Sequence, residues 1–205
     1  MKTAQNQYPG LYGNPQVEAI QKEIFERRMQ IIEILRSSAQ TVSSSYRLID
    51  GNGKEVALAD LFGDKDDLIL IHNMGKGCRY CTLWADEING ISKHIENRAA
   101  LAVVSPNSPE VQKEFAASRG WRLRMFSDRD MQFTKDMGFA YEKDGKSYPQ
   151  PGYSTFHREA DGSVTRIAYD EFGPTDMYSG IWHFFELLKD GENGWEPQYE
   201  YETAH

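Results

Sequence analysis

The stretch LILIHNMGKGCRYC at residues 68–81 determines how the rest of the chain is interpreted. Its opening residues, 68–72, form a continuous, largely apolar run, which is typical of a central parallel strand covered on both faces. Gly75 and Gly77 then loosen the backbone and lead into Cys78. From Cys78 on, apolar residues recur at helical spacing. The stretch therefore predicts a buried strand, a short loop and a helix that begins at the cysteine.

Similar patterns along the chain predict alternating strands and helices. We expect strands at 46–49, 100–104, 121–126, 153–158 and 164–169, a short strand and helical turn at 56–62, and helices at 109–119, 130–137 and 175–189. The segment 121–126 is expected to be an edge strand. This order is typical of a thioredoxin-like α/β fold of three layers, in which helices flank a central mixed sheet.

A long helix is predicted ahead of this domain. Asn14-Pro15 is a helix start, with Asn as the cap and Pro in the first turn. Apolar residues then repeat at helical spacing to about Ala39. We interpret this element as a packing helix or a dimer partner, so a homodimer is a candidate state. The predicted organisation is an N-terminal segment with the long helix at 1–40, the thioredoxin-like domain at 41–190, and an acidic, loosely held tail at 191–205.

Charge and hydropathy narrow the class of protein. The formal net charge of −8 argues against nonspecific nucleic-acid binding, which depends on Lys and Arg neutralising phosphates. No run approaches the roughly 18 apolar residues of a membrane span, and residues 1–14 lack the apolar core of a signal peptide. We therefore expect a cytoplasmic protein that binds neither nucleic acid nor membrane. With only two cysteines, the chain is no disulfide-stapled secreted scaffold.

The spacing Cys78-Arg79-Tyr80-Cys81 predicts a redox pair. Two cysteines three apart in the first turn of a helix reach disulfide geometry without unwinding it. Free amides and the positive end of the helix dipole stabilise a thiolate at Cys78, and Lys76 and Arg79 add positive charge nearby. Cys78 is therefore the expected nucleophile. Cys81, one turn deeper, is expected to resolve the mixed disulfide.

Other roles for the cysteine pair stay open at this point. A zinc site needs two further ligands, yet no second cysteine pair exists and no histidine stands in a recognised ligand spacing. The histidines considered are His72, His94, His157 and His183. The pair could instead be inert, reduced and packed in the core, or a permanent structural disulfide, which suits a cytosolic chain less well. We expect neither a metal nor another cofactor.

His72 is a candidate catalytic residue because it lies six residues before Cys78, at the end of the buried strand. Beneath the motif it would relay a proton to or from Cys81. The alternative is a core histidine whose ring is satisfied by a backbone carbonyl. Both interpretations are kept here.

Four further residues are candidate substrate contacts. Arg79 and Tyr80 stand between the cysteines, and we expect the Tyr80 ring to be exposed to a partner. Trp84 is either a core aromatic or a wall of the substrate cleft. Pro151 precedes the strand at 153–158, where a thioredoxin fold carries a proline with a cis peptide bond facing the cysteines. If Gln150–Pro151 is cis, its backbone would offer hydrogen bonds to an incoming chain; a trans loop proline is the alternative.

Several short motifs, taken in order, resemble the thioredoxin-like family catalogued as domain of unknown function 899. They are Val56 to Phe62, Cys78 to Asp86, Val103-Val104-Ser105, Gly120-Trp121-Arg122, Phe126-Ser127-Asp128, Tyr153 to Arg158, and the 178–188 helix with Gly180, Trp182 and His183. The resemblance runs from the long N-terminal helix to near Lys189. It implies a bacterial thioredoxin fold and dithiol–disulfide oxidoreductase activity, without an established substrate.

Two departures bear on the activity that this resemblance implies. Family members often carry small residues or Pro between the cysteines, whereas Arg79-Tyr80 is bulky and charged, and these positions tune the reduction potential. The family is also related to peroxiredoxins, whose site carries Pro seven residues and Thr or Ser three residues before the attacking cysteine. Here those positions hold Ile71 and Gly75.

The function predicted from the sequence is thiol–disulfide exchange with a protein or small-molecule disulfide or thiol. One alternative is a thiol peroxidase that recycles through the same disulfide. Another is a non-enzymatic binding or assembly module on a thioredoxin fold, in which the long helix and the tail form the working surface.

Overall fold

The computed structural model describes residues 14–202. The chain divides into two compact units, Met1–Ser38 and Ala39–His205, and each is described by itself. Among the helices of the described range, none combines enough length with enough hydropathy to cross a bilayer.

The first unit is the helix α1 (Pro15–Ser37). Its start is capped as the sequence predicts, because the Asn14 side chain accepts a hydrogen bond from the backbone N–H of Gln16 at 3.0 Å. None of its residues is buried. Its more than half-exposed apolar side chains are Ile20, Ile24, Phe25, Ile31 and Ile34. The long helix is confirmed, ending at Ser37 rather than near Ala39, and its self-association stays a prediction.

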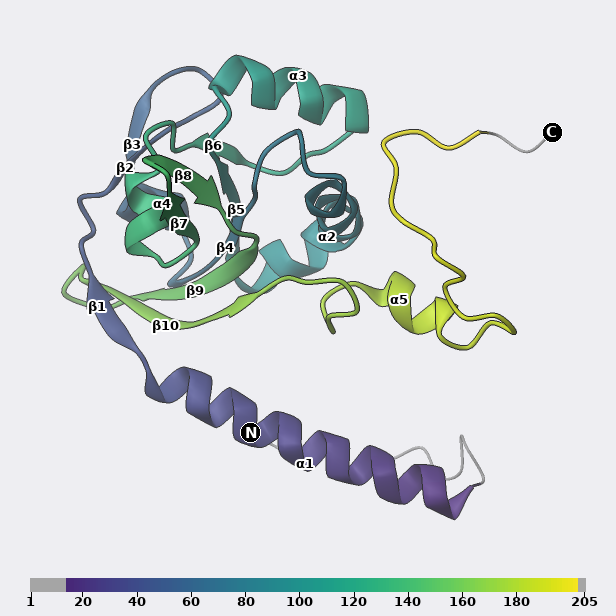
Figure 1. Cartoon of the computed structure of the whole chain (residues 1–205). Helices are drawn as coiled ribbons and strands as arrows, with labels where there is room; N and C mark the ends of the chain where they lie inside the picture. The colour runs from purple at the N-terminus through teal and green to yellow at the C-terminus, as the bar shows by residue number, and fades with distance from the viewer. Residues whose placement is uncertain (1–13, 203–205) are drawn as a thin grey trace. The chain divides into compact units, whose positions relative to one another are not determined.

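The second unit is built on an eight-stranded mixed sheet (Figure 1). The order across it is β1 (Gln40–Val42), β10 (Val164–Glu171), β9 (Gly152–Arg158), β4 (Asp67–His72), β5 (Ala100–Ser105), β6 (Met125–Ser127), β2 (Arg47–Ile49) and β3 (Glu55–Ala57). β4 runs parallel to β5, with Leu70 opposite Ala102, and antiparallel to β9, with His72 opposite Gly152. β4 is therefore the central strand that the sequence predicts, although only one of its neighbours is parallel.

Two hydrophobic cores lie on the two faces of this sheet. The covering elements are α2 (Arg79–Arg98) and α3 (Pro109–Arg119) on one face, and the 3₁₀-helix η1 (Leu58–Phe62) and α4 (Gln132–Asp136) on the other. Figure 1 shows α2 and α4 on opposite sides of β4 and β5. Alternation along β4 sends Leu68 and Leu70 to the core of η1 and α4, and Ile71 to the core of α2. The three-layer α/β architecture is confirmed.

The strand expected at 121–126 differs in extent and position. β6 contains only Met125–Ser127 and lies between β5 and β2, so it is not an edge strand. The preceding residues close the end of α3 instead, where the N–H of Trp121 donates to the carbonyl of Ala116 at 2.9 Å. The edge beyond β6 is occupied by the β2–β3 hairpin, because Ile49 pairs with Ser127.

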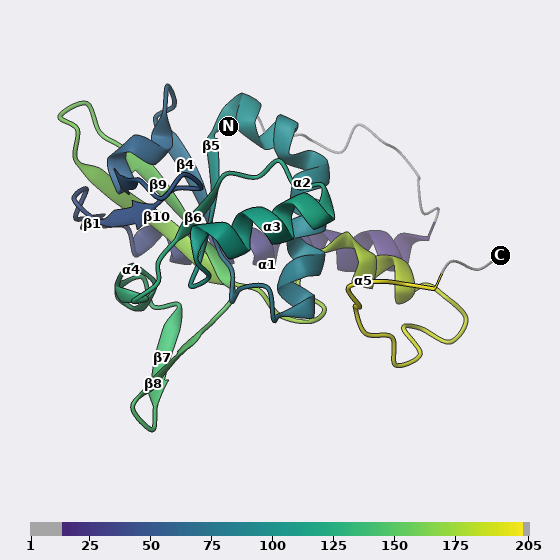
Figure 2. The same ribbon diagram turned by 90° about the horizontal axis from the view of Figure 1, so that it is seen from above.

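One hairpin was not predicted from the sequence. β7 (Ala140–Lys143) and β8 (Lys146–Pro149) are joined by Asp144-Gly145, whose φ angles are 52° and 71°. A two-residue turn with both φ angles positive is the usual connection of a tight hairpin, so Asp-Gly was the available signal. Figure 2 shows this hairpin projecting away from the sheet.

The last helix is shorter than the sequence pattern predicts. α5 spans Gly180–Phe185 instead of 175–189. The chain before it is a turn, in which the Asp176 side chain accepts hydrogen bonds from the N–H groups of Tyr178 and Ser179 at 2.8 and 3.0 Å. Asp competes for backbone donors in this way where a regular helix would otherwise begin.

We predict that the second unit folds without α1. All residues of both hydrophobic cores, and those packed against them, lie at Val42 or beyond. A variant lacking residues 1–38 should therefore unfold cooperatively, with a Tm within about 2–4 °C of the full chain, the shift that ~1 kcal/mol produces in a domain of this size. Thermal unfolding followed by circular dichroism checks this, and a non-cooperative transition would contradict it.

Candidate active site

A tight loop delivers Cys78 to the start of α2. Gly75 has a φ of +99°, and a Cβ there would lie 2.6 Å from Oδ1 of Asn107. That Asn107 oxygen accepts a hydrogen bond from the N–H of Lys76 at 2.7 Å. The N–H of Cys78 in turn donates to the Gly75 carbonyl at 3.1 Å. Glycine is therefore required at position 75, and Cys78 becomes the N-cap of α2.

The sulfur of Cys78 accepts hydrogen bonds in the way that the side-chain oxygen of an ordinary N-cap residue does. The backbone N–H of Cys81 donates to Cys78 Sγ at 3.1 Å. The Cys81 thiol and the N–H of Tyr80 are hydrogen-bonded to the same sulfur. The Cys81 thiol first, and these backbone groups, lower the pKa of the half-buried Cys78 to about 7, against the opposing effect of burial. Cys78 is therefore about half thiolate near neutral pH.

Cys81 has the opposite character. Its side chain is 3% exposed, and its hydrogen bond to Cys78, together with burial, raises its pKa far above the usual range. Both cysteines are free thiols in this structure. The two sulfurs therefore differ: the thiolate is favoured at Cys78, while the Cys81 thiol keeps its proton.

The cationic side chains near the motif act differently from our expectation. Hydrogen bonds dominate the lowered pKa of Cys78, rather than the charges of Lys76 and Arg79. The Arg79 guanidinium is directed to the carboxylate of Glu196, 3.0 Å away. Arg79 is therefore paired with a residue near the C-terminus of the chain.

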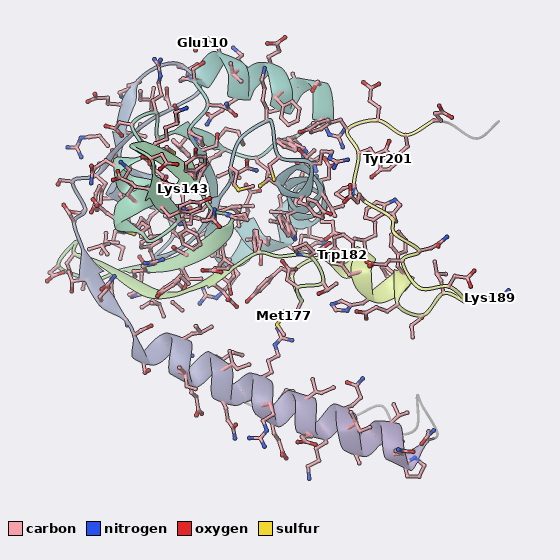
Figure 3. The ribbon with its side chains drawn as sticks, viewed as in Figure 1. Glu110, Lys143, Met177, Trp182, Lys189 and Tyr201 are labelled. Atoms are coloured by element: carbon pink, nitrogen blue, oxygen red, sulfur yellow. The ribbon has the colours of Figure 1, made fainter. Side chains whose placement is uncertain are left out.

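Aromatic rings pack beside the cysteine pair. Tyr80 is half-buried rather than exposed, and its ring lies 6.3 Å from Trp84 and 6.2 Å from Trp182, between centroids. Trp84 is 3% exposed and also packs on Phe172 at 5.1 Å. Trp84 is thus a core aromatic that supports the Tyr80 ring from behind. Figure 3 labels Trp182 on α5.

The structure does not bring His72 to the cysteines. Its ring stacks on Phe139, with centroids 3.9 Å apart, and its Nε2 is 3.0 Å from Oγ of Ser154. Phe139 belongs to the core of η1 and α4, whereas Cys81 belongs to the core of α2 on the other face of the sheet. The expected proton relay to Cys81 is therefore wrong. His72 is a core histidine bonded to a side-chain hydroxyl, because its position on β4 alternates with that of Ile71.

The cis peptide bond expected at Gln150–Pro151 is also wrong, since no peptide bond in residues 14–202 is cis. The chain enters β9 in extended form: the N–H of Gln150 donates to the Phe139 carbonyl at 2.7 Å, and the Pro151 carbonyl accepts from Phe172 at 3.1 Å. These bonds commit both flanking backbone groups to the protein itself. A substrate-docking role for Pro151 stays a prediction.

The residues near the C-terminus that contact the loop before α2 were not predicted from the sequence. The tail was expected to be loosely held, yet Tyr199 Oη donates to the Lys76 carbonyl at 2.9 Å and Pro197 is buried. The acidic, glycine-containing composition of 191–205 carries no signal for these contacts, which depend on tertiary structure. Figure 3 shows Tyr201 on this segment.

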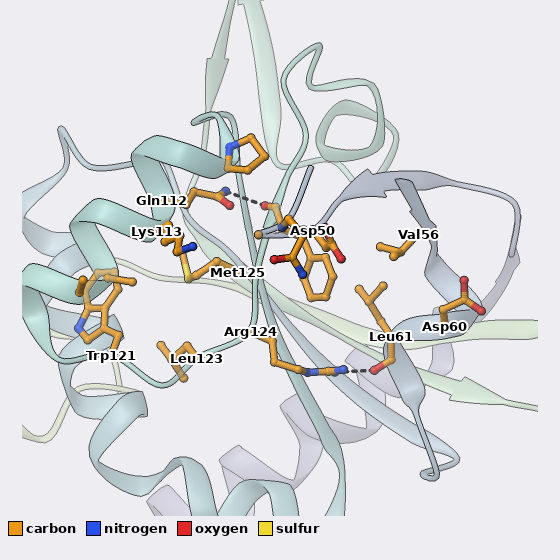
Figure 4. A pocket seen from close by; sticks show the side chains of 16 residues that line it. Asp50, Val56, Asp60, Leu61, Gln112, Lys113, Trp121, Leu123, Arg124 and Met125 are labelled. Atoms are coloured by element: carbon orange, nitrogen blue, oxygen red, sulfur yellow. Dashed lines mark hydrogen bonds between the residues drawn. The ribbon is translucent and has the colours of Figure 1, made fainter. Parts of the chain in front are cut away.

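A separate pocket of about 610 Å³ lies among the β2–β3 hairpin, η1, α3 and β6 (Figure 4). Two of the polar side chains that line it donate hydrogen bonds to other groups of the protein. Gln112 Nε2 donates to Ser105 Oγ at 2.8 Å, and Arg124 donates to the Leu61 carbonyl at 2.5 Å. Neither cysteine lines this pocket. In the described part of the chain, no group of three His, Cys, Asp or Glu side chains is placed to hold a metal ion.

The comparisons with known proteins agree with this architecture. The pattern of the family described as bacterial protein of unknown function DUF899 matches residues 22–203. The chain belongs to the DUF899 family. None of the curated proteins matches this DUF899 chain.

Solved structures similar to the DUF899 chain include peroxiredoxins. The peroxidoxin BcpB of Mycobacterium tuberculosis is 23% identical, with a TM-score of 0.54 over 65% of this chain and 84% of its own. Peroxiredoxin Q of Xanthomonas campestris is 19% identical, with a TM-score of 0.53 over 69% and 89%. Reduced Prx3 of Vibrio vulnificus, solved with hydrogen peroxide, is 18% identical, with a TM-score of 0.53 over 67% and 88%. These matches confirm the thioredoxin-like fold.

The hydrogen bond from the Cys81 thiol predicts a specific change in the pKa of Cys78. Cys81→Ala removes the donor and should move the pKa of Cys78 upward from about 7, towards the value of an ordinary thiol. Cys81→Ser keeps a hydroxyl donor and should stay close to 7. The pH dependence of the alkylation rate measures both values. Equal pKa values in the two variants would contradict this role of the Cys81 thiol.

The position of His72 predicts an effect on stability alone. His72→Leu loses the bond to Ser154 and should lower the free energy of unfolding by about 1–3 kcal/mol. The pH profile of Cys78 alkylation should be unchanged, because His72 lies on the other face of the sheet. Urea unfolding and alkylation kinetics on one preparation test this. A shifted pH profile of Cys78 alkylation would show that His72 does affect Cys78.

Proposed function

We propose that this protein is a thiol–disulfide oxidoreductase in which Cys78 attacks and Cys81 resolves. The observation that supports it most is the pairing of a half-buried Cys78, with a pKa of about 7, and a buried Cys81 thiol hydrogen-bonded to it. An attacking thiol is most effective when its pKa lies near the ambient pH. The redox function itself agrees with the thioredoxin-like fold of the neighbours.

The reaction proceeds in two exchanges. The Cys78 thiolate attacks one sulfur of a disulfide, which forms a mixed disulfide and releases the other half as a thiolate. Cys81 loses its proton and attacks the Cys78 sulfur, which releases the second half and leaves a Cys78–Cys81 disulfide. The substrate gains two electrons, which the two cysteines lose. The proton of Cys81 goes to one released thiolate, and the other thiolate takes its proton from solvent. An external thiol then returns the pair to the reduced form.

The Cys81 proton connects these two steps. While Cys78 is a thiolate, the Cys81 thiol donates to it and its own pKa is raised. Once Cys78 is in the mixed disulfide, that negative charge is gone and the pKa of Cys81 falls. The second attack thus becomes favourable only after the first has taken place. We propose that this cycle runs in the cytoplasm, where cellular thiols keep such pairs reduced.

A thiol peroxidase is the second candidate, favoured by the fold shared with peroxiredoxins. There the Cys78 thiolate would attack hydrogen peroxide, break the O–O bond, keep one oxygen as a sulfenic acid and release the other as hydroxide. The Cys81 thiol would then condense with the sulfenic acid, which forms the disulfide and releases water. Position 75 argues against this reaction. Its φ of +99° and the nearby Asn107 exclude the Ser or Thr that such a site carries three residues before its cysteine.

Trapping of the mixed disulfide tests the proposed exchange. Reduced Cys81→Ser protein treated with bis(2-hydroxyethyl) disulfide should accumulate an adduct on Cys78, because no second thiol can resolve it. The wild-type chain should proceed to the intramolecular disulfide, and Cys78→Ser should react slowly. Intact-protein and peptide mass spectrometry identify the products. No adduct on Cys78 in Cys81→Ser, or a fast adduct on Cys81 in Cys78→Ser, would refute the assignment.

Stopped-flow kinetics with hydrogen peroxide separate the second candidate from the first. The exchange assignment predicts slow loss of the Cys78 thiolate with peroxide and faster loss with the disulfide. Cys78→Ser is the control for background oxidation. A faster reaction with peroxide than with the disulfide would favour the peroxidase instead.

A further inference from the structure

The C-terminal segment, defined here as residues 195–201, contacts the active-site loop on both sides of Cys78. Before the cysteine, the Tyr199 hydroxyl donates to the carbonyl of Lys76 at 2.9 Å. After it, the Glu196 carboxylate pairs with the Arg79 guanidinium at 3.0 Å. Two side chains of the segment therefore bond to residues within two positions of Cys78 in the chain.

Contacts away from the loop anchor the segment from α3 and α2. Arg119 donates to the Tyr199 carbonyl at 2.5 Å and pairs through the same guanidinium with Asp86 of α2. The Tyr199 ring meets Phe115 edge-on, with centroids 6.1 Å apart. Tyr199 is thus fixed through its backbone, its ring and its hydroxyl.

Aromatic packing anchors the other end of the segment. The Trp195 ring lies 5.5 Å from Trp182, 5.0 Å from Phe185 and 6.5 Å from Tyr201, between centroids. Trp182 is also the ring against which Tyr80 packs, at 6.2 Å. The segment and Tyr80, one of the two residues between the cysteines, therefore share one aromatic cluster.

The negative charge of the Cys78 thiolate affects the pKa of Tyr199. Burial raises the pKa of the Tyr199 phenol, and the charge on Cys78 raises it further. The phenol thus stays protonated beside the thiolate. In contrast, the Arg79–Glu196 pair is largely exposed, with side chains 43% and 58% accessible, and exposed pairs of this kind contribute little. Tyr199 and Trp195 hold the segment in place more than this ion pair does.

We propose that the C-terminal segment restricts Cys78 to small, low-molecular-weight disulfides and excludes disulfides of folded proteins. This inference rests on the proposed exchange function. A protein substrate presents its disulfide on an extended backbone that must lie along the surface beside the attacking sulfur. The segment is bonded to Lys76 and Arg79, which lie within two positions of Cys78 in the chain, while the sulfur of Cys78 itself is only half-buried. A slender molecule can therefore reach the sulfur where a polypeptide would have to displace the segment.

Single-turnover kinetics of the pre-reduced protein test the inference with two probes, bis(2-hydroxyethyl) disulfide and insulin. The variants are a chain ending at Gly194, the full-length double variant Trp195→Ala/Tyr199→Ala, and the matched control Glu202→Ala, an exposed residue just beyond the segment. The double variant retains the rest of the tail, should the truncation fail to fold.

The wild type and Glu202→Ala should react with the small disulfide and only slowly with insulin. Truncation and the double variant should raise the insulin rate relative to the small-disulfide rate by at least about tenfold, the effect of no longer displacing a hydrogen bond and ring contacts. An unchanged ratio, or equal losses with both probes, would overturn the inference. Failure of the wild type with both probes would instead refute the exchange function itself.

Discussion

The hydrogen bond from the Cys81 N–H to the Cys78 sulfur, at 3.1 Å, is the interaction on which the rest of the site depends. It exists because Cys78 is the N-cap of α2, and that position is set by the turn at Gly75. An N-cap residue normally supplies a hydroxyl or carboxylate oxygen, which accepts hydrogen bonds from the backbone N–H groups of the first turn. Here a sulfur takes that place, so the donors that begin the helix also favour the thiolate.

A network of buried polar side chains lies on the face of the sheet opposite the cysteines. On the face opposite α2, Ser154 Oγ lies 3.0 Å from Nε2 of His72 and accepts a hydrogen bond from Nε of Arg166 at 3.1 Å. Burial lowers the pKa of Arg166 to about 10, so it stays charged at neutral pH, and its guanidinium lies 3.9 Å from the Tyr169 ring. Burial, and then the charge of Arg166, lower the pKa of His72, which stays neutral. This network belongs to the core and not to the reaction.

The sequence correctly predicted the elements that depend on residues close to one another in the chain. The helix at 109–119 is observed with those bounds, and Cys78 is found at a helix start after a buried strand. His72 was misassigned because alternation along β4 shows which residues share a face but not which face α2 covers. The Pro151 prediction came from the expected fold rather than from local sequence, and the hydrogen bonds of its neighbours are tertiary. Tyr199 had no signal, since its hydrogen-bond partners Lys76 and Arg119 lie 123 and 80 residues away in the chain.

The most direct measurement is the reduction state of the two cysteines across a series of glutathione redox buffers, by alkylation and mass spectrometry. We predict a single two-electron transition in which Cys78 and Cys81 form one disulfide, with a midpoint inside the cellular range of glutathione potentials. That result would establish a working redox pair, and the midpoint would show whether it acts as reductant or oxidant. Thiols that never pair, or a disulfide that never opens, would contradict the central claim.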